Sequence, residues 1–269
     1  MQKHNFHTHT IYSDGHDSIP EIIEAAIERG FTQLGLSDHS HTYYQNGFCL
    51  AHGSEADYIR AVRSEAAKYA DKINVYAGIE LDSESEVPHD DFDYVLASVH
   101  DMSKGGKVLP IDFSPEVETR IVSEMFGGSW TDFAKTNYDK FYIHLLRNKA
   151  DIVGHFDLIT KYSLVPEDDG KYVDITLEAL RSIVPMCSTF ELNTGAIARG
   201  LKNIPYPSDF VLREMKNLGC RLIVTSDCHY KEKLTVWFNE AEDYLSSLGF
   251  RKSENESINE KIRGISMWI

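Results

Sequence analysis

The sequence predicts a single-domain α/β barrel in which parallel strands alternate with helices. Seven short apolar stretches recur along the chain, and segments with helical periodicity separate most of them. Seven or eight strands in about 250 residues favour a closed barrel over an open sheet. The 269 residues contain no low-complexity linker and no short internal repeat, so we expect one domain over residues 1–269.

The predicted strands are short and end in polar residues. They cover residues 5–7, 33–37, 74–80, 94–99, 151–154, 189–193 and 221–225. Helices are predicted within residues 18–30, 55–70, 115–147, 175–183, 209–218 and 235–248. Residues 82–92 and 103–113 are expected to form loops over the barrel mouth, and residues 253–269 fit either a final strand or a packed extension.

The first helix has clear start and stop signals. Ser18 and Glu21 have the spacing of a capping box, and Pro20 falls in the first turn. Gly30 follows the last apolar position, where a left-handed residue commonly ends a helix. A helix is therefore expected to begin at Ser18 and to end before Gly30.

The chain is acidic, with 42 Asp+Glu against 27 Lys+Arg and a formal charge of −15 with neutral histidines. Because nucleic-acid binders rely on cationic side chains that meet phosphates, this charge argues against a nucleic-acid partner. No stretch approaches the roughly 20 apolar residues that span a bilayer, and the first residues are too polar for a signal peptide, so no membrane partner and a cytoplasmic location are expected. The four widely spaced cysteines favour free thiols.

Side chains that commonly bind metals stand at the carboxyl ends of the predicted strands. Parallel strands deliver these ends to one rim of a barrel, so the side chains should meet in one polar pocket. Aspartate also suits a turn such as Ser13-Asp14-Gly15, where His16 is the alternative donor. The set comprises six histidines, two aspartates and one glutamate: His7, His9, Asp14, His39, Glu80, His100, His155, Asp227 and His229.

Such a set of donors predicts bound cations. Three carboxylates at one rim would repel one another, and buried imidazoles would lack partners, unless metal ions lay between them. His7 and His9 share one strand face at spacing i and i+2, and Asp227 and His229 have the same spacing. Nine donors exceed the three or four that one zinc takes, so we expect two or three divalent ions, with zinc, iron or manganese suited to these ligands.

The order of these motifs resembles the polymerase-and-histidinol-phosphatase (PHP) superfamily over nearly the whole chain. Residues 153–162 and 191–199 are similar to the stand-alone histidinol-phosphate phosphatase branch of that superfamily. The matching segments are His7-Thr-His9-Thr-Ile-Tyr-Ser-Asp14-Gly, Leu36-Ser-Asp38-His39, Gly78-Ile-Glu80, Ala97-Ser-Val-His100, residues 151–159 and Ser226-Asp227-Cys-His229.

The resemblance implies a distorted (β/α)7 barrel, similar to a TIM barrel, with three divalent ions. Many members of the branch carry histidine in the first loop where Ser13-Asp14-Gly15 stands here, so His16 stays an alternative to Asp14. By position, the first ion would be held by His7, His9, Glu80 and Asp227, the second by Glu80, His100 and His155, and the third by Asp14, His39 and His229.

The activity that the resemblance implies is hydrolysis of L-histidinol phosphate, a step of histidine biosynthesis. A hydroxide that bridges two metals would attack phosphorus. Arg199 is expected to grip the phosphate and Lys161 to add a second positive contact, with a surface salt bridge as the alternative for each. His41 and Asp17 lie in predicted rim loops and are candidates for the acid that protonates the leaving alkoxide.

The expected partner is a small phosphomonoester that carries cationic groups, which acidic side chains at the mouth could help to capture. Alternatives in the same chemical class are another small phosphoester, a phosphotyrosine or a nucleic-acid 3′ end. A catalytically silent barrel is an alternative from another class, but it would have no chemical reason to keep nine donors. The acidic candidates at the mouth are Glu84, Glu86, Asp90 and Asp91.

Overall fold

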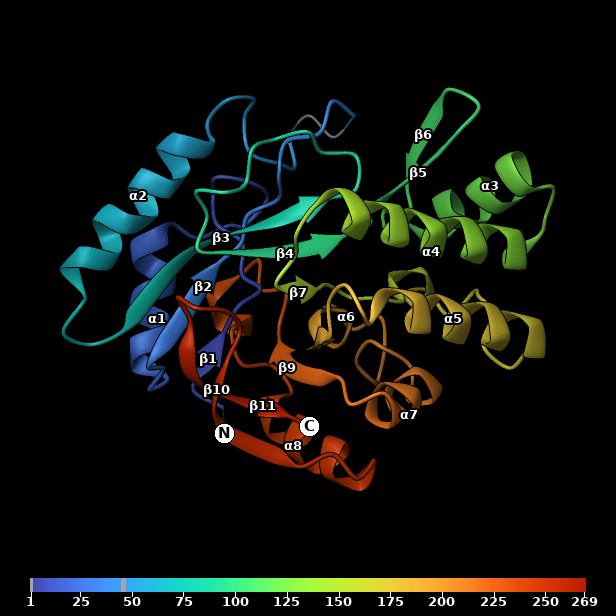
Figure 1. The fold of residues 1–269 in the computed structure, drawn as a ribbon. Coiled ribbons are helices and arrows are strands. Elements are labelled where there is room, and N and C mark those ends of the chain that lie inside the picture. Colours follow the sequence, from blue (N-terminus) through green and yellow to red (C-terminus); the bar gives the residue numbers. More distant parts are fainter. Residues whose placement is uncertain (1, 45–46) are drawn as a thin grey trace.

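Seven parallel strands form the barrel that the sequence predicts (Figure 1). The computed structural model describes residues 2–44 and 47–269. The order around the barrel follows the chain, and every neighbouring pair is parallel. The strands are β1 (His4–Asn5), β2 (Gln33–Leu36), β3 (Asn74–Asp82), β4 (Tyr94–Ser98), β7 (Ile152–Val153), β8 (Thr189–Asn193) and β9 (Arg221–Thr225).

The barrel closes in two different ways at its two ends, which is why it is distorted. Just beyond the carboxyl ends of β1 and β9, the backbone N–H of His9 donates to the carbonyl of Cys228 at 2.8 Å, and Thr8 and Cys228 form a parallel bridge. At the other end an antiparallel hairpin, β10 (Lys252–Ser257) and β11 (Arg263–Trp268), extends the sheet from β9. Residues 253–269 are therefore a strand pair rather than an irregular extension.

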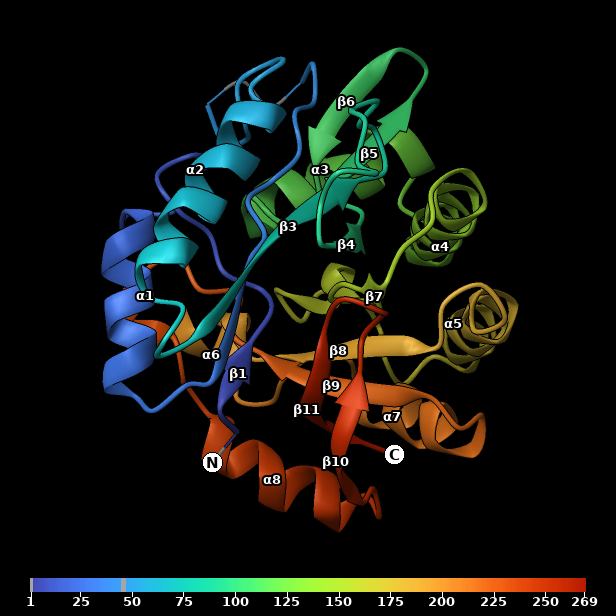
Figure 2. The ribbon, with the colours of Figure 1, turned by 60° about the vertical axis from the view of Figure 1, so that its left-hand side comes forward.

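Helices surround the strands on the outside (Figure 2). In that view α1 and α2 cover one side of the barrel, and α4, α5 and α7 cover another. Each predicted helical region overlaps one of them, and residues 115–147 contain two, but α5 begins at Gly170 rather than near Ile175 and α6 was not predicted. The helices are α1 (Ile19–Glu28), α2 (Glu55–Lys68), α3 (Pro115–Phe126), α4 (Trp130–Arg147), α5 (Gly170–Ile183), α6 (Gly195–Ala198), α7 (Asp209–Asn217) and α8 (Phe238–Ser247).

The capping box of α1 is confirmed. The carboxylate of Glu21 accepts hydrogen bonds from the backbone N–H of Ser18 at 2.9 Å and from its hydroxyl at 2.6 Å. Gly30 follows the helix with a φ of +74°, in the left-handed region that glycine adopts without strain. α1 is thereby fixed at both ends, directly after the loop that carries His9 and Asp14.

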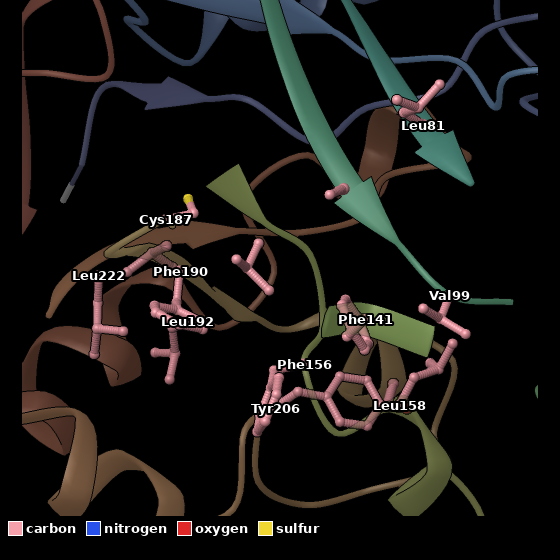
Figure 3. Close-up of a cluster of buried hydrophobic side chains, with 14 of the residues drawn as sticks. Leu81, Val99, Phe141, Phe156, Leu158, Cys187, Phe190, Leu192, Tyr206 and Leu222 are labelled. Atoms are coloured by element: carbon pink, nitrogen blue, oxygen red, sulfur yellow. The ribbon is translucent and has the colours of Figure 1, made fainter. Parts of the chain in front are cut away.

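Alternation along the strands separates two apolar cores. Outward-facing residues pack under the helices, and Figure 3 shows part of this cluster around Phe156, Phe190 and Leu192. Inward-facing residues form a smaller cluster inside the barrel that the hairpin residues Ile265 and Met267 complete. The amino end of the barrel is therefore filled with apolar side chains, and the polar donors are left to the carboxyl end.

The ring of Tyr94 fills the middle of the barrel. Its hydroxyl donates to the carbonyl of Phe6 at 2.9 Å. A Cβ added at Gly35 or Gly78 would lie 2.2–2.3 Å from atoms of this ring, so glycine at both positions makes room for it. Glu80 stands two residues beyond Gly78 on the same inward face, so it lies between the ring of Tyr94 and the carboxyl end of the barrel.

The prediction that residues 103–113 form a loop is wrong in part. β5 (Asp101–Lys104) and β6 (Lys107–Pro110) pair as an antiparallel hairpin that projects from the barrel (Figure 1). Gly105 and Gly106 both have positive φ, +59° and +79°, as a two-residue turn of the favoured hand requires. The Gly-Gly pair was the sequence signal for this hairpin.

Among the described residues, no helix is long and apolar enough to cross a membrane.

Candidate metal centre

All nine predicted donors meet at the carboxyl end of the barrel. The donors follow strands that are far apart in the sequence but end at the same rim of the barrel. Their imidazole rings therefore lie close: the His9 centroid is 4.2 Å from that of His229 and 4.4 Å from that of His39. Four overlapping groups have donor atoms within 4.8 Å of one another, and together they contain all nine residues. The predicted convergence of the donors is therefore present.

One group joins β1 to β9. The Nε2 atom of His7 lies 3.2 Å from Oε2 of Glu80, and Nε2 of His9 lies 3.2 Å from Oδ1 of Asp227. The crossed distances, His7 to Asp227 and His9 to Glu80, are 3.7 and 3.6 Å. His7, His9 and Asp227 form one close set of donors, and Oε2 of Glu80 lies at its edge, where it is also 2.9 Å from Nδ1 of His39. Together with Glu80, the set offers the four donors that tetrahedral zinc takes.

A second group surrounds the other oxygen of Glu80. Oε1 of Glu80 lies 2.9 Å from Nε2 of His155 and 3.2 Å from Nε2 of His100. These two imidazole nitrogens are 3.3 Å apart. Because its two oxygens face different groups, Glu80 has the placement of a bridging ligand.

A third group lies toward the mouth of the cavity. Nε2 of His229 is 3.0 Å from Oδ2 of Asp14, and Nε2 of His39 is 3.7 Å from its Oδ1. The Nδ1 atom of His9 is also 3.7 Å from Oδ1 of Asp14. His16 is exposed and stacks on Tyr230 with ring centroids 4.0 Å apart, so the geometry favours Asp14 as the donor from the first loop.

Unpaired buried atoms show that the donor set fits metal ions, independently of any resemblance. Nε2 of His7, both ring nitrogens of His9 and Oε2 of Glu80 are buried atoms without a hydrogen-bond partner. Burial would raise the pKa of the Glu80 carboxyl, but the imidazoles of His7, His39 and His100 hold it well below its usual range. Burial, reinforced by His229 and His39, lowers the pKa of His9 to about 3. The neighbouring carboxylates outweigh burial and raise the pKa of His7, His39 and His100. A divalent cation would replace the protons on these imidazoles and balance the charge of Glu80.

Two further carboxylates orient the donors, and the sequence analysis missed both. Nδ1–H of His7 donates to Oε2 of Glu191 at 2.8 Å, which leaves Nε2 free to face Glu80. Nδ1–H of His100 donates in the same way to Oδ2 of Asp82 at 3.1 Å. Asp82 follows Glu80 by two residues in β3, and Glu191 precedes Asn193 by two in β8, so strand alternation was the available signal.

A cavity of about 380 Å³ opens above the donors. Arg199 and Lys161 both line it, as do six of the nine donors. The Arg199 guanidinium donates to Oδ2 of Asp227 at 3.1 Å and lies 3.0 Å from Nδ1 of His229. Lys161 Nζ donates to the carbonyl and to Oδ2 of Asp112, both at 2.9 Å. Arg199 therefore stands beside two of the donors, and Lys161 is a buried residue of the cavity wall, paired with Asp112.

The two predicted acid candidates are not brought to this cavity. Asp17 accepts a hydrogen bond from the backbone N–H of Lys231 at 2.7 Å and lies 3.4 Å from its Nζ. The His41 ring contacts the carbonyl of Leu50 at 3.3 Å and packs against His52 with centroids 5.0 Å apart. Neither lines the cavity. The same holds for the acidic residues Glu84, Glu86, Asp90 and Asp91.

A model of the PHP domain matches residues 5–195, which is most of the chain. The chain belongs to the PHP domain family. Arg199, Asp227 and His229 lie beyond the matched residues, and β9 together with the segment after β8 brings them to the same rim. The resemblance stated from the motifs is confirmed.

Known proteins and solved structures are similar to this chain over most of its length. A Schizosaccharomyces pombe protein named "Probable histidinol-phosphatase" is 25% identical over 260 residues, 86% of this chain and 81% of that protein. The structure of histidinol phosphate phosphatase from Lactococcus lactis subsp. lactis, complexed with zinc, L-histidinol and phosphate, has a TM-score of 0.69 at 19% identity, covering 93% of this chain and 95% of that chain. The hisK structure from Listeria monocytogenes has a TM-score of 0.73 at 19% identity, covering 88% and 99%. These structures confirm the distorted barrel fold.

Proposed function

We propose that the chain is a metal-dependent phosphomonoesterase that hydrolyses L-histidinol phosphate to L-histidinol and phosphate, a reaction of histidine biosynthesis. The observation that carries this proposal is that nine potential metal donors meet at one rim, beneath a cavity that Lys161 and Arg199 also line. The PHP family, and the histidinol phosphatase names of relatives that match over most of the chain, support the choice of substrate.

We further propose that three divalent ions, drawn from zinc, iron and manganese, occupy the three groups of donors. Histidine and carboxylate ligands suit all three metals, and the Lactococcus lactis structure holds zinc. Glu80 would bridge the first two groups through its two oxygens, and His9 faces both the first and the third group through its two nitrogens. Asp14, rather than His16, would complete the third.

The residues of the chain then act in separate roles. When bound, divalent ions a few ångströms apart lower the pKa of a coordinated water and neutralise phosphate oxygens. Arg199 binds two phosphate oxygens through its planar guanidinium group, and Lys161, from the segment after β7, adds a second positive charge. Glu191 and Asp82 keep His7 and His100 in the tautomers whose Nε2 atoms face the donors. Asp17 and His41 take no part in this scheme, because neither lines the cavity.

Steady-state kinetics on three substrates test the assignment. We expect kcat/KM for L-histidinol phosphate to exceed that for p-nitrophenyl phosphate by more than tenfold, with no measurable cleavage of a short oligonucleotide at its 3′ end. A preference below tenfold would refute the substrate and leave a general PHP phosphoesterase. The net charge of −15 opposes the oligonucleotide.

We treat residues 1–269 as one phosphatase domain acting on a small molecule, without a nucleic-acid or membrane partner. We also propose that it works in the cytoplasm. Among the described residues, Cys187, Cys220 and Cys228 form no disulfide, as is usual in reducing compartments.

A further inference from the structure

Two chain segments rise above the donors, and each returns to the metal donor from which it started. The backbone N–H of Leu50 donates to the carbonyl of His39 at 2.9 Å, which ties the described residues 47–50 back to that donor. The N–H of Ile111 donates to the carbonyl of His100 at 2.8 Å, which closes the β5–β6 hairpin. The walls of the cavity are therefore tied to its metal-binding floor on both sides.

The hairpin turns an apolar face toward the cavity. Val108 and Pro110 lie two residues apart on β6 and both line the cavity, whereas Leu109 between them packs against the outer core. The pairing of Asp101 with Pro110 places that carboxylate on the same face. Phe113 follows directly and also lines the cavity.

Three large aromatic side chains at the mouth of this cavity are exposed to solvent. Phe113 is 66% exposed, and Tyr44 and Phe48 on the facing segment are 58% and 51% exposed, although all three line the cavity. Lys161, held by Asp112, and Arg199 stand below them beside the donors. The cavity thus has a cationic and metal-binding floor and an aromatic rim, and it fits an ester with phosphate at one end and a flat ring at the other.

We propose that Tyr44, Phe48 and Phe113 form the subsite for the ring of the leaving alcohol and set the preference for a ring-bearing phosphomonoester. The proposal rests on the proposed function, in which that ring is the imidazole of histidinol. Aromatic rings stack on a flat ring and attract a positive charge through their faces, so a partly protonated imidazole suits this rim. An alkyl alcohol gains neither contact.

The experiment compares kcat/KM for L-histidinol phosphate and for n-propyl phosphate, which has no ring, in the metal-loaded protein. Phe113→Ala and Phe48→Ala are each expected to lower kcat/KM for histidinol phosphate by about five- to tenfold, mainly through KM, from the lost ring contact. The value for propyl phosphate should stay within twofold. The control Tyr142→Ala removes an exposed ring from α4, away from the cavity, and should change neither value.

Equal losses on both esters would mean that the rings only support the fold, and no loss on either would mean that the ring binds elsewhere; each result overturns the proposal. If the wild type does not prefer histidinol phosphate, the proposed substrate fails. The subsite is then judged with p-nitrophenyl phosphate in place of histidinol phosphate, where Phe113→Ala must still lower kcat/KM selectively. Calorimetric titration with L-histidinol in the presence of phosphate gives a second readout, in which Phe113→Ala should weaken binding by a similar factor.

Discussion

Glu191→Gln tests whether a buried carboxylate sets the tautomer of a metal donor. Oε2 of Glu191 accepts from Nδ1–H of His7 at 2.8 Å and from the Thr225 hydroxyl at 2.7 Å. Oε1 accepts from the backbone N–H of His155 and from Nδ2 of Asn193 at 2.8 Å. All four donors point at one fully buried carboxylate, so an amide cannot satisfy them unchanged.

The structure determines which way the new amide must turn. An NH₂ on the Oε1 side would face two N–H donors. The backbone N–H of His155 cannot accept a hydrogen bond, and the Asn193 amide cannot turn its oxygen toward Glu191, because that oxygen already accepts from the N–H of Gly195 at 2.8 Å. Each unsatisfied group would cost about 1–3 kcal/mol. On the other side the threonine hydroxyl can rotate and His7 can change tautomer. His7 would then carry its proton on Nε2, the atom that faces Glu80.

A protonated Nε2 cannot bind a metal, so the affinity of the first group should fall by about 10–100-fold, or about 1.4–2.7 kcal/mol. Zinc affinity is measured by competition with a chromophoric chelator. Thr225→Val removes one donor to the same oxygen but leaves the His7 contact, and it should stay within threefold of the wild type. Wild-type zinc affinity in Glu191→Gln would refute the role assigned to Glu191.

Three further changes give separate readouts. Arg199→Ala should raise KM at least tenfold with unchanged metal content, and kcat/KM within threefold of the wild type would exclude the phosphate role. Asp157→Ala removes the acceptor of the Ser208 N–H and hydroxyl, each at 2.8 Å, and should lower the free energy of unfolding in urea by about 1–3 kcal/mol; an unchanged midpoint would contradict this. Burial and the nearby Asp112 raise the pKa of Glu118 from 4.5 to about 8, so its ionisation weakens the fold as pH rises through that interval. The melting temperature of Glu118→Gln should therefore exceed that of the wild type by an amount that grows from pH 5 to pH 8 and is absent at pH 4. Glu116→Gln, on the exposed face of α3, is the control and should show no such growth. A difference for Glu118→Gln that does not change with pH would contradict the raised pKa.

The strands and the metal donors could be predicted because both follow from short-range patterns. Parallel strands place their carboxyl ends at one rim, so a histidine directly after a strand, such as His155, has its position fixed by the fold. Arg199 and Lys161 also line the cavity, since each lies in the segment after a strand that ends at this rim, but their contacts with phosphate stay a prediction.

Residues in longer loops could not be placed in this way. Nothing in the local sequence shows that Asp17 turns toward Lys231 or that His41 turns toward His52, because contacts from elsewhere in the chain decide these directions. The role of Glu191 depends on β8 facing His7 across the barrel interior, a relation between residues 184 positions apart. The apolar wall above the site was missed because the Gly105-Gly106 turn was not recognised.

The central claim is that metal ions held by these nine donors perform the hydrolysis. Its most direct measurement is kcat/KM for L-histidinol phosphate in exhaustively chelated protein as zinc, manganese or iron is returned and the bound metal is counted. We expect activity to be absent after chelation and to rise until three equivalents are bound per chain. Full activity in protein that holds no metal would contradict the account.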